Sequence, residues 1–77
     1  MRTGKVRILR VSSFEIFPTF GQARKLKKIE YQLEGFPPRF LFIPEEQYDV
    51  RTLKYRILED LKNLIPDLKD IELEWPS

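Results

Sequence analysis

The pattern of apolar and polar positions predicts a long first strand. The segment Lys5–Phe17 is rich in β-branched and aromatic residues, which favour extended backbone. Its alternation slips in phase near Ser12 and Ser13, which indicates either one strand with a bulge or two short strands. Phe14 and Ile16 share a parity that suits burial, so we expect both side chains to face the core.

The next two segments predict a β-hairpin. Leu26–Glu34 alternates cleanly and places Ile29, Tyr31 and Leu33 on one face, which is typical of a strand with one buried and one solvated side. A turn rich in glycine and proline follows, and Arg39–Ile43 is an apolar run that a proline ends. These two segments are therefore expected to pair.

The second half of the chain predicts an amphipathic helix and a last strand. Asp49 can cap a helix whose apolar positions recur at steps of three and four residues until Pro66 ends it. These positions are Val50, Leu53, Ile57, Leu58, Leu61, Leu64 and Ile65. Ile71–Trp75 alternates, with Trp75 expected to point inward and seal the edge of the core. The order β-β-β-α-β predicts a single α+β domain over residues 1–77, with a small mixed or antiparallel sheet and one helix on one face.

The stretch RFLFIPEEQYDVRTLKYRI, Arg39 to Ile57, resembles the second strand and helix start of ubiquitin-like β-grasp proteins. The resemblance covers Lys28 to Trp75 and implies that the hairpin from Lys28 to Ile43 forms the first two strands of that fold. The chain ends in Glu74-Trp75-Pro76-Ser77, without the diglycine tail of conjugated family members. The resemblance therefore implies an interaction module rather than a modifier.

The composition limits the chemistry that this chain can perform. It has no cysteine and no histidine, which removes thiol catalysis, the usual general base and the commonest metal ligand. The three glycines form no phosphate-binding loop, and no carboxylate pair has a catalytic spacing. Glu45, Glu46 and Asp49 could hold a hard cation, but they are explained more simply as charges that complement the helix dipole. We expect a protein that is not an enzyme and uses no cofactor or metal.

Charge and hydropathy bear on location and partners. The 34% of charged residues, with many Lys, Arg and Glu, favours a thermophilic source. No apolar run reaches the roughly 20 residues that span a bilayer, so we expect a cytoplasmic protein. The net charge of +2 combines nine basic and three acidic residues in positions 1–39 with five basic and nine acidic residues in positions 40–77. This asymmetry favours a partner with a charged face.

A basic run beside loop aromatic residues is the main candidate for a contact site. The candidate residues are Phe17, Phe20, Arg24, Lys25, Lys27 and Lys28. The basic side chains could contact phosphates while Phe14, Phe17 and Phe20 stack on unpaired bases. Alternatively, the phenylalanines belong to the core and a turn, and the lysines form a solvated strand end that discourages edge pairing.

The helix adds one further candidate contact. Tyr55 lies off the apolar stripe and is a type of residue enriched at protein interfaces. Arg56 and Asp60 stand four residues apart and are expected to pair. The first hypothesis is a non-catalytic protein-protein interaction module, whose partner is another protein or a second copy, or a subunit of a larger assembly. The alternative is a small nucleic-acid-binding protein that uses the basic run and the neighbouring phenylalanines.

Overall fold

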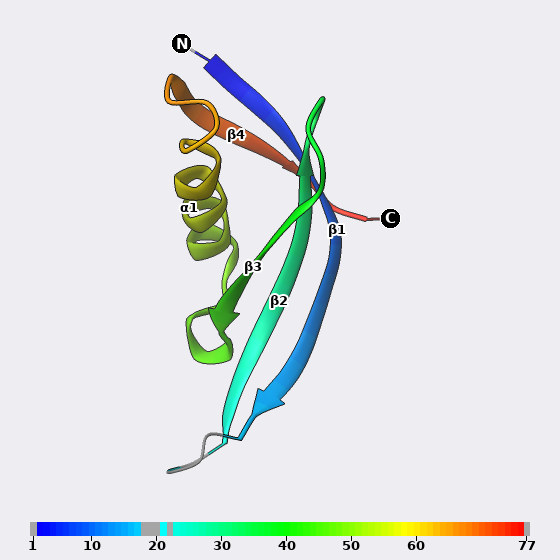
Figure 1. The fold of residues 1–77 in the computed structure, drawn as a ribbon, viewed down its shortest axis with the longest axis vertical. Helices are drawn as coiled ribbons and strands as arrows, with labels where there is room; N and C mark the ends of the chain where they lie inside the picture. Colours follow the sequence, from blue (N-terminus) through cyan, green and yellow to red (C-terminus); the bar gives the residue numbers. More distant parts are fainter. Residues whose placement is uncertain (1, 18–20, 22, 77) are drawn as a thin grey trace.

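The elements follow the predicted order β-β-β-α-β, with a short 3-10 helix before the α-helix. The computed structural model describes residues 2–17, 21 and 23–76. Figure 1 shows the α-helix on one side of a sheet that curls around it. The bounds are β1 Arg2–Ile16, β2 Arg24–Leu33, β3 Arg39–Pro44, η1 Glu45–Gln47, α1 Val50–Leu61 and β4 Leu68–Glu74.

The four strands form one mixed sheet in the order β3-β2-β1-β4. β2 is antiparallel to both β1 and β3, which confirms the predicted hairpin of β2 and β3, and β4 is parallel to β1. A small α+β fold with one helix and a mixed sheet is thus confirmed. The β-grasp arrangement is not confirmed, because the last strand lies beside β1 and not beside the hairpin Lys28 to Ile43 that the resemblance made the first pair.

β1 is one long strand with a bulge, but the bulge lies earlier than predicted. The register against β2 shifts between Ile8 and Arg10, not at the two serines. One extra residue at this point reverses which parity faces the helix. Phe14 and Ile16 therefore turn to the face away from α1, where they are 38% and 43% exposed. The prediction that both lie in the core is wrong.

The core fills the space between the sheet and α1. Ile29, Tyr31 and Leu33 are buried, as the clean alternation of β2 predicts. β1, β3 and β4 add Val6, Ile8, Ile43, Leu68 and Ile71 from their inner faces. This face of the sheet is thus covered by a single helix.

α1 starts where predicted but is one turn shorter. The Asp49 carboxylate accepts the backbone N–H of Thr52 at 2.7 Å, which caps the first turn. Leu53, Ile57 and Leu61 form the buried stripe at steps of four residues. The helix ends at Leu61, and turns carry the chain to Ile65, which is still buried. No helix in the described ranges is long and apolar enough to cross a membrane.

Three apolar residues predicted to face the core lie at the surface. Val50, in the first turn of α1, is 60% exposed, and Leu64, beyond the end of the helix, is 43% exposed. Trp75 follows the end of β4 and is 45% exposed, so the expectation that it seals the core is wrong. Each lies at or beyond the end of an element, where few neighbouring side chains cover it.

Candidate functional site

The face of the sheet turned away from α1 carries an apolar cluster, here called the outer patch: Phe14, Leu26, Phe40 and Phe42. The register places Phe14 opposite Leu26 of β2, and Phe42 of β3 opposite Lys28, the next residue of β2 on the same face. The rings of Phe14 and Phe42 meet edge to face with centroids 5.4 Å apart, and those of Phe40 and Phe42 are 5.7 Å apart. These rings pack on one another instead of entering the core.

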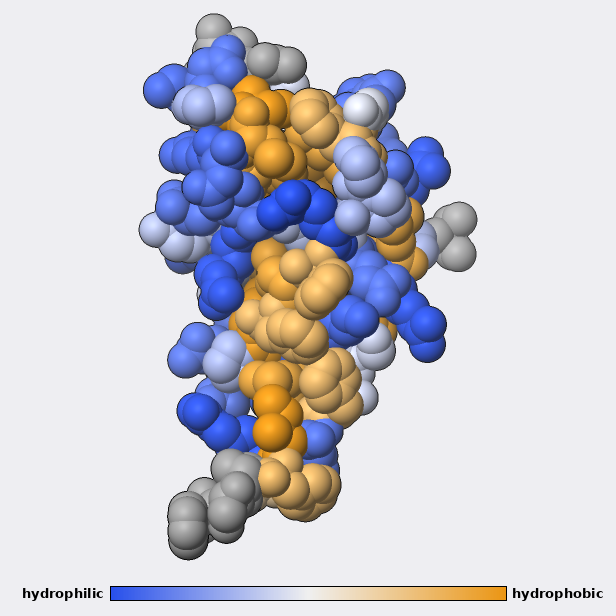
Figure 2. Space-filling model, viewed as in Figure 1, coloured by the Kyte–Doolittle hydropathy of each residue, from blue (hydrophilic) through white to orange (hydrophobic). Residues whose placement is uncertain are grey.

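The outer patch is open to solvent. Phe14 and Phe42 are each 38% exposed and Phe40 is 58% exposed. Figure 2 shows a continuous apolar band, bordered by hydrophilic side chains, over the lower part of the molecule where the β1–β2 hairpin and β3 lie. Contiguous exposed apolar surface of this kind marks binding sites more often than isolated apolar residues do.

Strand alternation divides the predicted basic run between the two faces of the sheet. Arg24 and Lys28 share the outer face with Leu26 of the patch, whereas Lys25 and Lys27 alternate to the side of the helix. Arg10 pairs with Glu30 in the register and also lies on the outer face. The run is therefore not one uniform cationic surface.

The two central lysines make different contacts. Lys28 Nζ lies 4.7 Å from the centroid of the Phe40 ring and 3.6 Å from a carboxylate oxygen of Glu30. Lys27 Nζ donates a hydrogen bond of 2.7 Å to Ser13 Oγ and lies 5.7 Å from the centroid of the Tyr48 ring. Of these two lysines, Lys28 is the one that places its charge against the outer patch.

The two predicted aromatic contact residues that the structure describes, Phe17 and Tyr55, lie on different elements. Phe17 follows the end of β1 and is 75% exposed, so its predicted exposure is confirmed. Phe20 lies outside the described residues. Tyr55 is 62% exposed on α1, which covers the opposite face of the sheet from the outer patch. Tyr55 and the patch therefore cannot serve one small contact surface.

The sequence pattern did not identify the outer-patch residues Phe40 and Phe42. Ile43 is fully buried, so alternation along β3 sends both phenylalanines to the other face. The apolar run RFLFI hides this alternation because both faces of the strand are apolar. The neighbouring strand carried a signal that Phe40 and Phe42 face solvent. Their register partners, Glu30 and Lys28, are polar.

Tyr31, Arg39 and Asp60 form a polar cluster that joins β2, β3 and α1. The hydroxyl of Tyr31, whose side chain is buried, donates to Asp60, and Arg39 donates to both carboxylate oxygens, at 2.7 and 3.2 Å. The predicted pair of Arg56 and Asp60 is wrong. Arg56 instead donates to the carbonyl of Phe42 at 3.3 Å, because Arg39 offers the carboxylate a bidentate partner.

The same cluster shifts the pKa of its members. Hydrogen bonds from Arg39 lower the pKa of Asp60 below its ordinary value, although partial burial opposes the shift. Burial, together with the Asp60 carboxylate, raises the pKa of Tyr31 well above its ordinary value. The lowered pKa favours the ionised form of Asp60 and the raised pKa favours the neutral form of Tyr31, and these are the forms that the hydrogen bonds between β2, β3 and α1 require.

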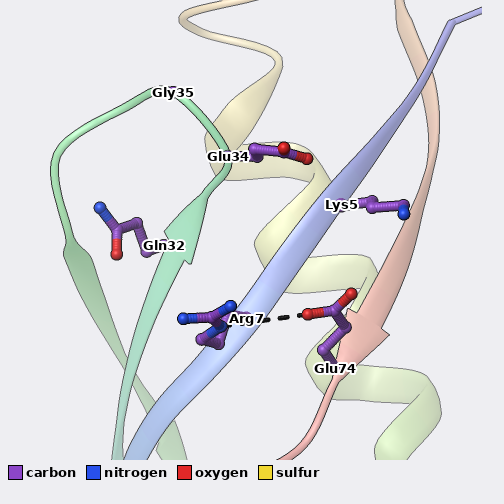
Figure 3. Close-up of a pocket in the computed structure, with 6 residues that line it drawn as sticks. All are labelled: Lys5, Arg7, Gln32, Glu34, Gly35 and Glu74. Atoms are coloured by element: carbon purple, nitrogen blue, oxygen red, sulfur yellow. Dashed lines mark ion pairs between the residues drawn. The ribbon is translucent and has the colours of Figure 1, made fainter.

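A polar pocket of about 330 Å³ lies at the other end of the outer face. Its lining residues are Lys5, Arg7, Gln32, Glu34, Gly35 and Glu74. In Figure 3 the side chain of Arg7 extends toward Glu74, with 4.0 Å between Nε and the carboxylate. The side chain of Arg7 is mostly exposed and that of Glu74 is about half exposed, so the pair is screened by water. The mixed charges select no single class of ligand.

A second, more open groove runs between α1 and β4. It has a volume of about 460 Å³, and Val50 and Trp75 are among its lining residues. The ion pair of Lys54 and Asp70, at 3.2 Å, joins the two elements there. The exposed side chains of Val50 and Trp75 give this groove some apolar surface, on another part of the molecule than the outer patch.

Of the three acidic residues before α1, Asp49 interacts with the helix, whereas Glu45 and Glu46 belong to η1. Asp49 caps the first turn, and this hydrogen bond from Thr52 lowers its pKa. Among the described residues, no group of three or more acidic side chains is arranged to hold a metal ion.

The comparisons with known proteins return nothing similar to this chain. No family model matches, and neither the curated proteins nor the solved structures contain a match.

Proposed function

We propose that this protein is a non-catalytic interaction module that docks a macromolecular partner on the outer patch. One observation carries the proposal: three phenylalanine rings gather on the uncovered face of the sheet, each at least 38% exposed. Exposing them is costly in water, at about 25 cal/mol for each Å² of apolar surface, and a partner that covers them recovers this free energy. The ubiquitin-like resemblance of Arg39 to Ile57 supports the same class of function.

The test is site-specific photo-cross-linking in cells of the source organism. A photoreactive phenylalanine analogue replaces Phe40 in the patch or, as the matched control, Tyr55, which is similarly exposed but lies on α1. We expect the analogue at position 40 to cross-link a protein or nucleic acid that the analogue at position 55 does not cross-link. If position 40 captures nothing, or captures the same molecules as position 55, the proposal is wrong.

A second candidate partner, a strand from a second copy or another protein, is favoured by the edge of β1. β4 pairs with β1 only as far as Arg7, and in the described part of the chain β1 continues to Ile16 with β2 as its one neighbour. The other edges are better protected. Arg56 donates to the carbonyl of Phe42 on β3, and the carboxylate of Asp70 accepts the N–H of Ile71 on β4.

An added strand at this edge would extend the sheet by main-chain hydrogen bonds. If a second copy occupies it, the mass measured by sedimentation should double as protein concentration rises. Charge placed at the edge by Val11→Lys should abolish the change, while Arg51→Glu on α1 should not. A lone monomer at all concentrations would exclude the self-pairing mode.

A further inference from the structure

We infer that the partner of the outer patch is single-stranded nucleic acid, which rests on the proposed function of that patch. The first reason is charge. Around the outer patch, the outer face of positions 10–16 of β1, 24–30 of β2 and all of β3 carries three cations, Arg10, Arg24 and Lys28, against one anion, Glu30. The face is therefore complementary to an anionic backbone.

The second reason is the arrangement of rings and cations. Lys28 Nζ lies over the Phe40 ring, 4.7 Å from its centroid, so a charge that can meet a phosphate is in contact with a ring that can meet a base. Phe40 is more than half exposed, and Phe14 and Phe42 continue the apolar surface across β3 to β1. Stacking needs only a flat face on each base, so this surface fits nucleic acid of varied sequence.

The third reason concerns strandedness. The sheet curls around α1, so the outer patch lies on its convex side (Figure 1). Phenyl rings on such a surface can reach the faces of unpaired bases, whereas a duplex buries those faces in its own stack. The patch is therefore specific for single strands and discriminates against duplex of the same sequence.

The charges give a quantitative salt dependence. If Arg10, Arg24 and Lys28 each contact one phosphate, the logarithm of the affinity falls with the logarithm of salt concentration with a slope of about −2 for a single strand. Raising the salt from about 50 to 200 mM should then weaken binding about 20-fold. Glu30, 3.6 Å from Lys28, competes with phosphate for that lysine.

Fluorescence anisotropy tests this inference by comparing labelled single strands of DNA and RNA with the matching duplexes. Strands of about 12 nucleotides are within the range of lengths that one stacking surface covers. Phe40→Leu keeps an apolar side chain but removes the ring, and should weaken single-strand binding roughly fivefold or more at either salt. Lys28→Gln should weaken binding at low salt and reduce the effect of salt from about 20-fold to about 7-fold. The matched controls on α1, Tyr55→Leu and Arg51→Gln, should change neither quantity.

Several results would overturn the inference. These are no binding at the lower salt, equal binding of duplex and single strand, or unchanged binding by folded Phe40→Leu protein. Circular dichroism establishes that each variant is folded. If oligonucleotides do not bind but cross-linking from position 40 captures a protein, the inference is wrong and the proposed function stands. If cross-linking from position 40 also fails, both are wrong.

Discussion

Replacing Asp60 by alanine should lower the free energy of unfolding by about 2 kcal/mol. Asp60 is the shared acceptor of Tyr31 and Arg39, so its removal leaves the buried Tyr31 hydroxyl without that acceptor. An unsatisfied buried hydroxyl costs about 1–3 kcal/mol. The side chain of Arg39 is 39% exposed and can be rehydrated, so its lost ion pair adds only about 0–1 kcal/mol.

The measurement is urea and thermal unfolding of the purified protein. For a domain of this size, about 2 kcal/mol corresponds to a fall in Tm of roughly 8–16 °C. Glu59→Ala, at the neighbouring exposed position of α1, is the matched control and should change Tm little. The double variant Asp60→Ala with Tyr31→Phe should lose less stability than the sum of the single variants, because the two groups interact.

A loss below about 0.5 kcal/mol for Asp60→Ala, or strict additivity with Tyr31→Phe, would refute this account of the cluster. Either result would mean that water satisfies the Tyr31 hydroxyl as well as the carboxylate does.

Three further predictions concern pH, a close contact and the helix cap. The pKa of Tyr31 is raised in the folded state, so the stability that its neutral form contributes is complete below the unfolded pKa of about 10 and is lost as pH rises above that value. Unfolding measured at alkaline pH should show this loss, and the Tyr31→Phe variant should not show it. Gly4→Ala should reduce stability by about 1 kcal/mol in urea unfolding, because the added Cβ would lie 2.8 Å from Cδ1 of buried Leu33, and an unchanged midpoint would show that Leu33 moves freely. Asp49→Ala should lower Tm and the helical signal in circular dichroism, while Asp49→Ser, which also caps helices, should retain most of both.

The local pattern of apolar and polar residues was sufficient to identify core residues where one side of an element is apolar and the other is polar. The alternation of β2 correctly identified Ile29, Tyr31 and Leu33 as core residues, and the spacing of α1 identified the stripe that contains Leu53 and Ile57. A single favourable register exists in such segments, because a shift of one residue would expose the whole apolar set.

Pattern failed where both faces of a strand are apolar. In β3, Phe40 and Phe42 differ little from Ile43 by hydropathy, and only pairing with β2 decides which of them the helix covers. In β1, the position of the bulge decides whether Phe14 faces the core or solvent, and pairing with β2 fixes that position. The hydropathy of β1 and β3 by itself therefore does not identify the outer patch.

The basic run shows the same division between sequence and structure. The sequence contains the four cations, and the alternation of a strand implies that they cannot all share one side. The strand pairing then places Arg24 and Lys28 on the face of the outer patch and brings Arg10 to that face from β1. The proposed nucleic-acid surface thus shares only Arg24 and Lys28 with the contact site expected from the sequence.

The sequence by itself determined the number, type and order of the main elements, because alternation, helical spacing, prolines and a capping aspartate act over a few residues. The sequence also contains no cysteine and no histidine. Tertiary structure alone decided the strand order, the bulge at Leu9, the partners of Asp60 and the meeting of Phe14 with Phe42. These depend on contacts between residues far apart in the chain, whose free energies are set by packing and hydrogen bonding across strands and not by local preference.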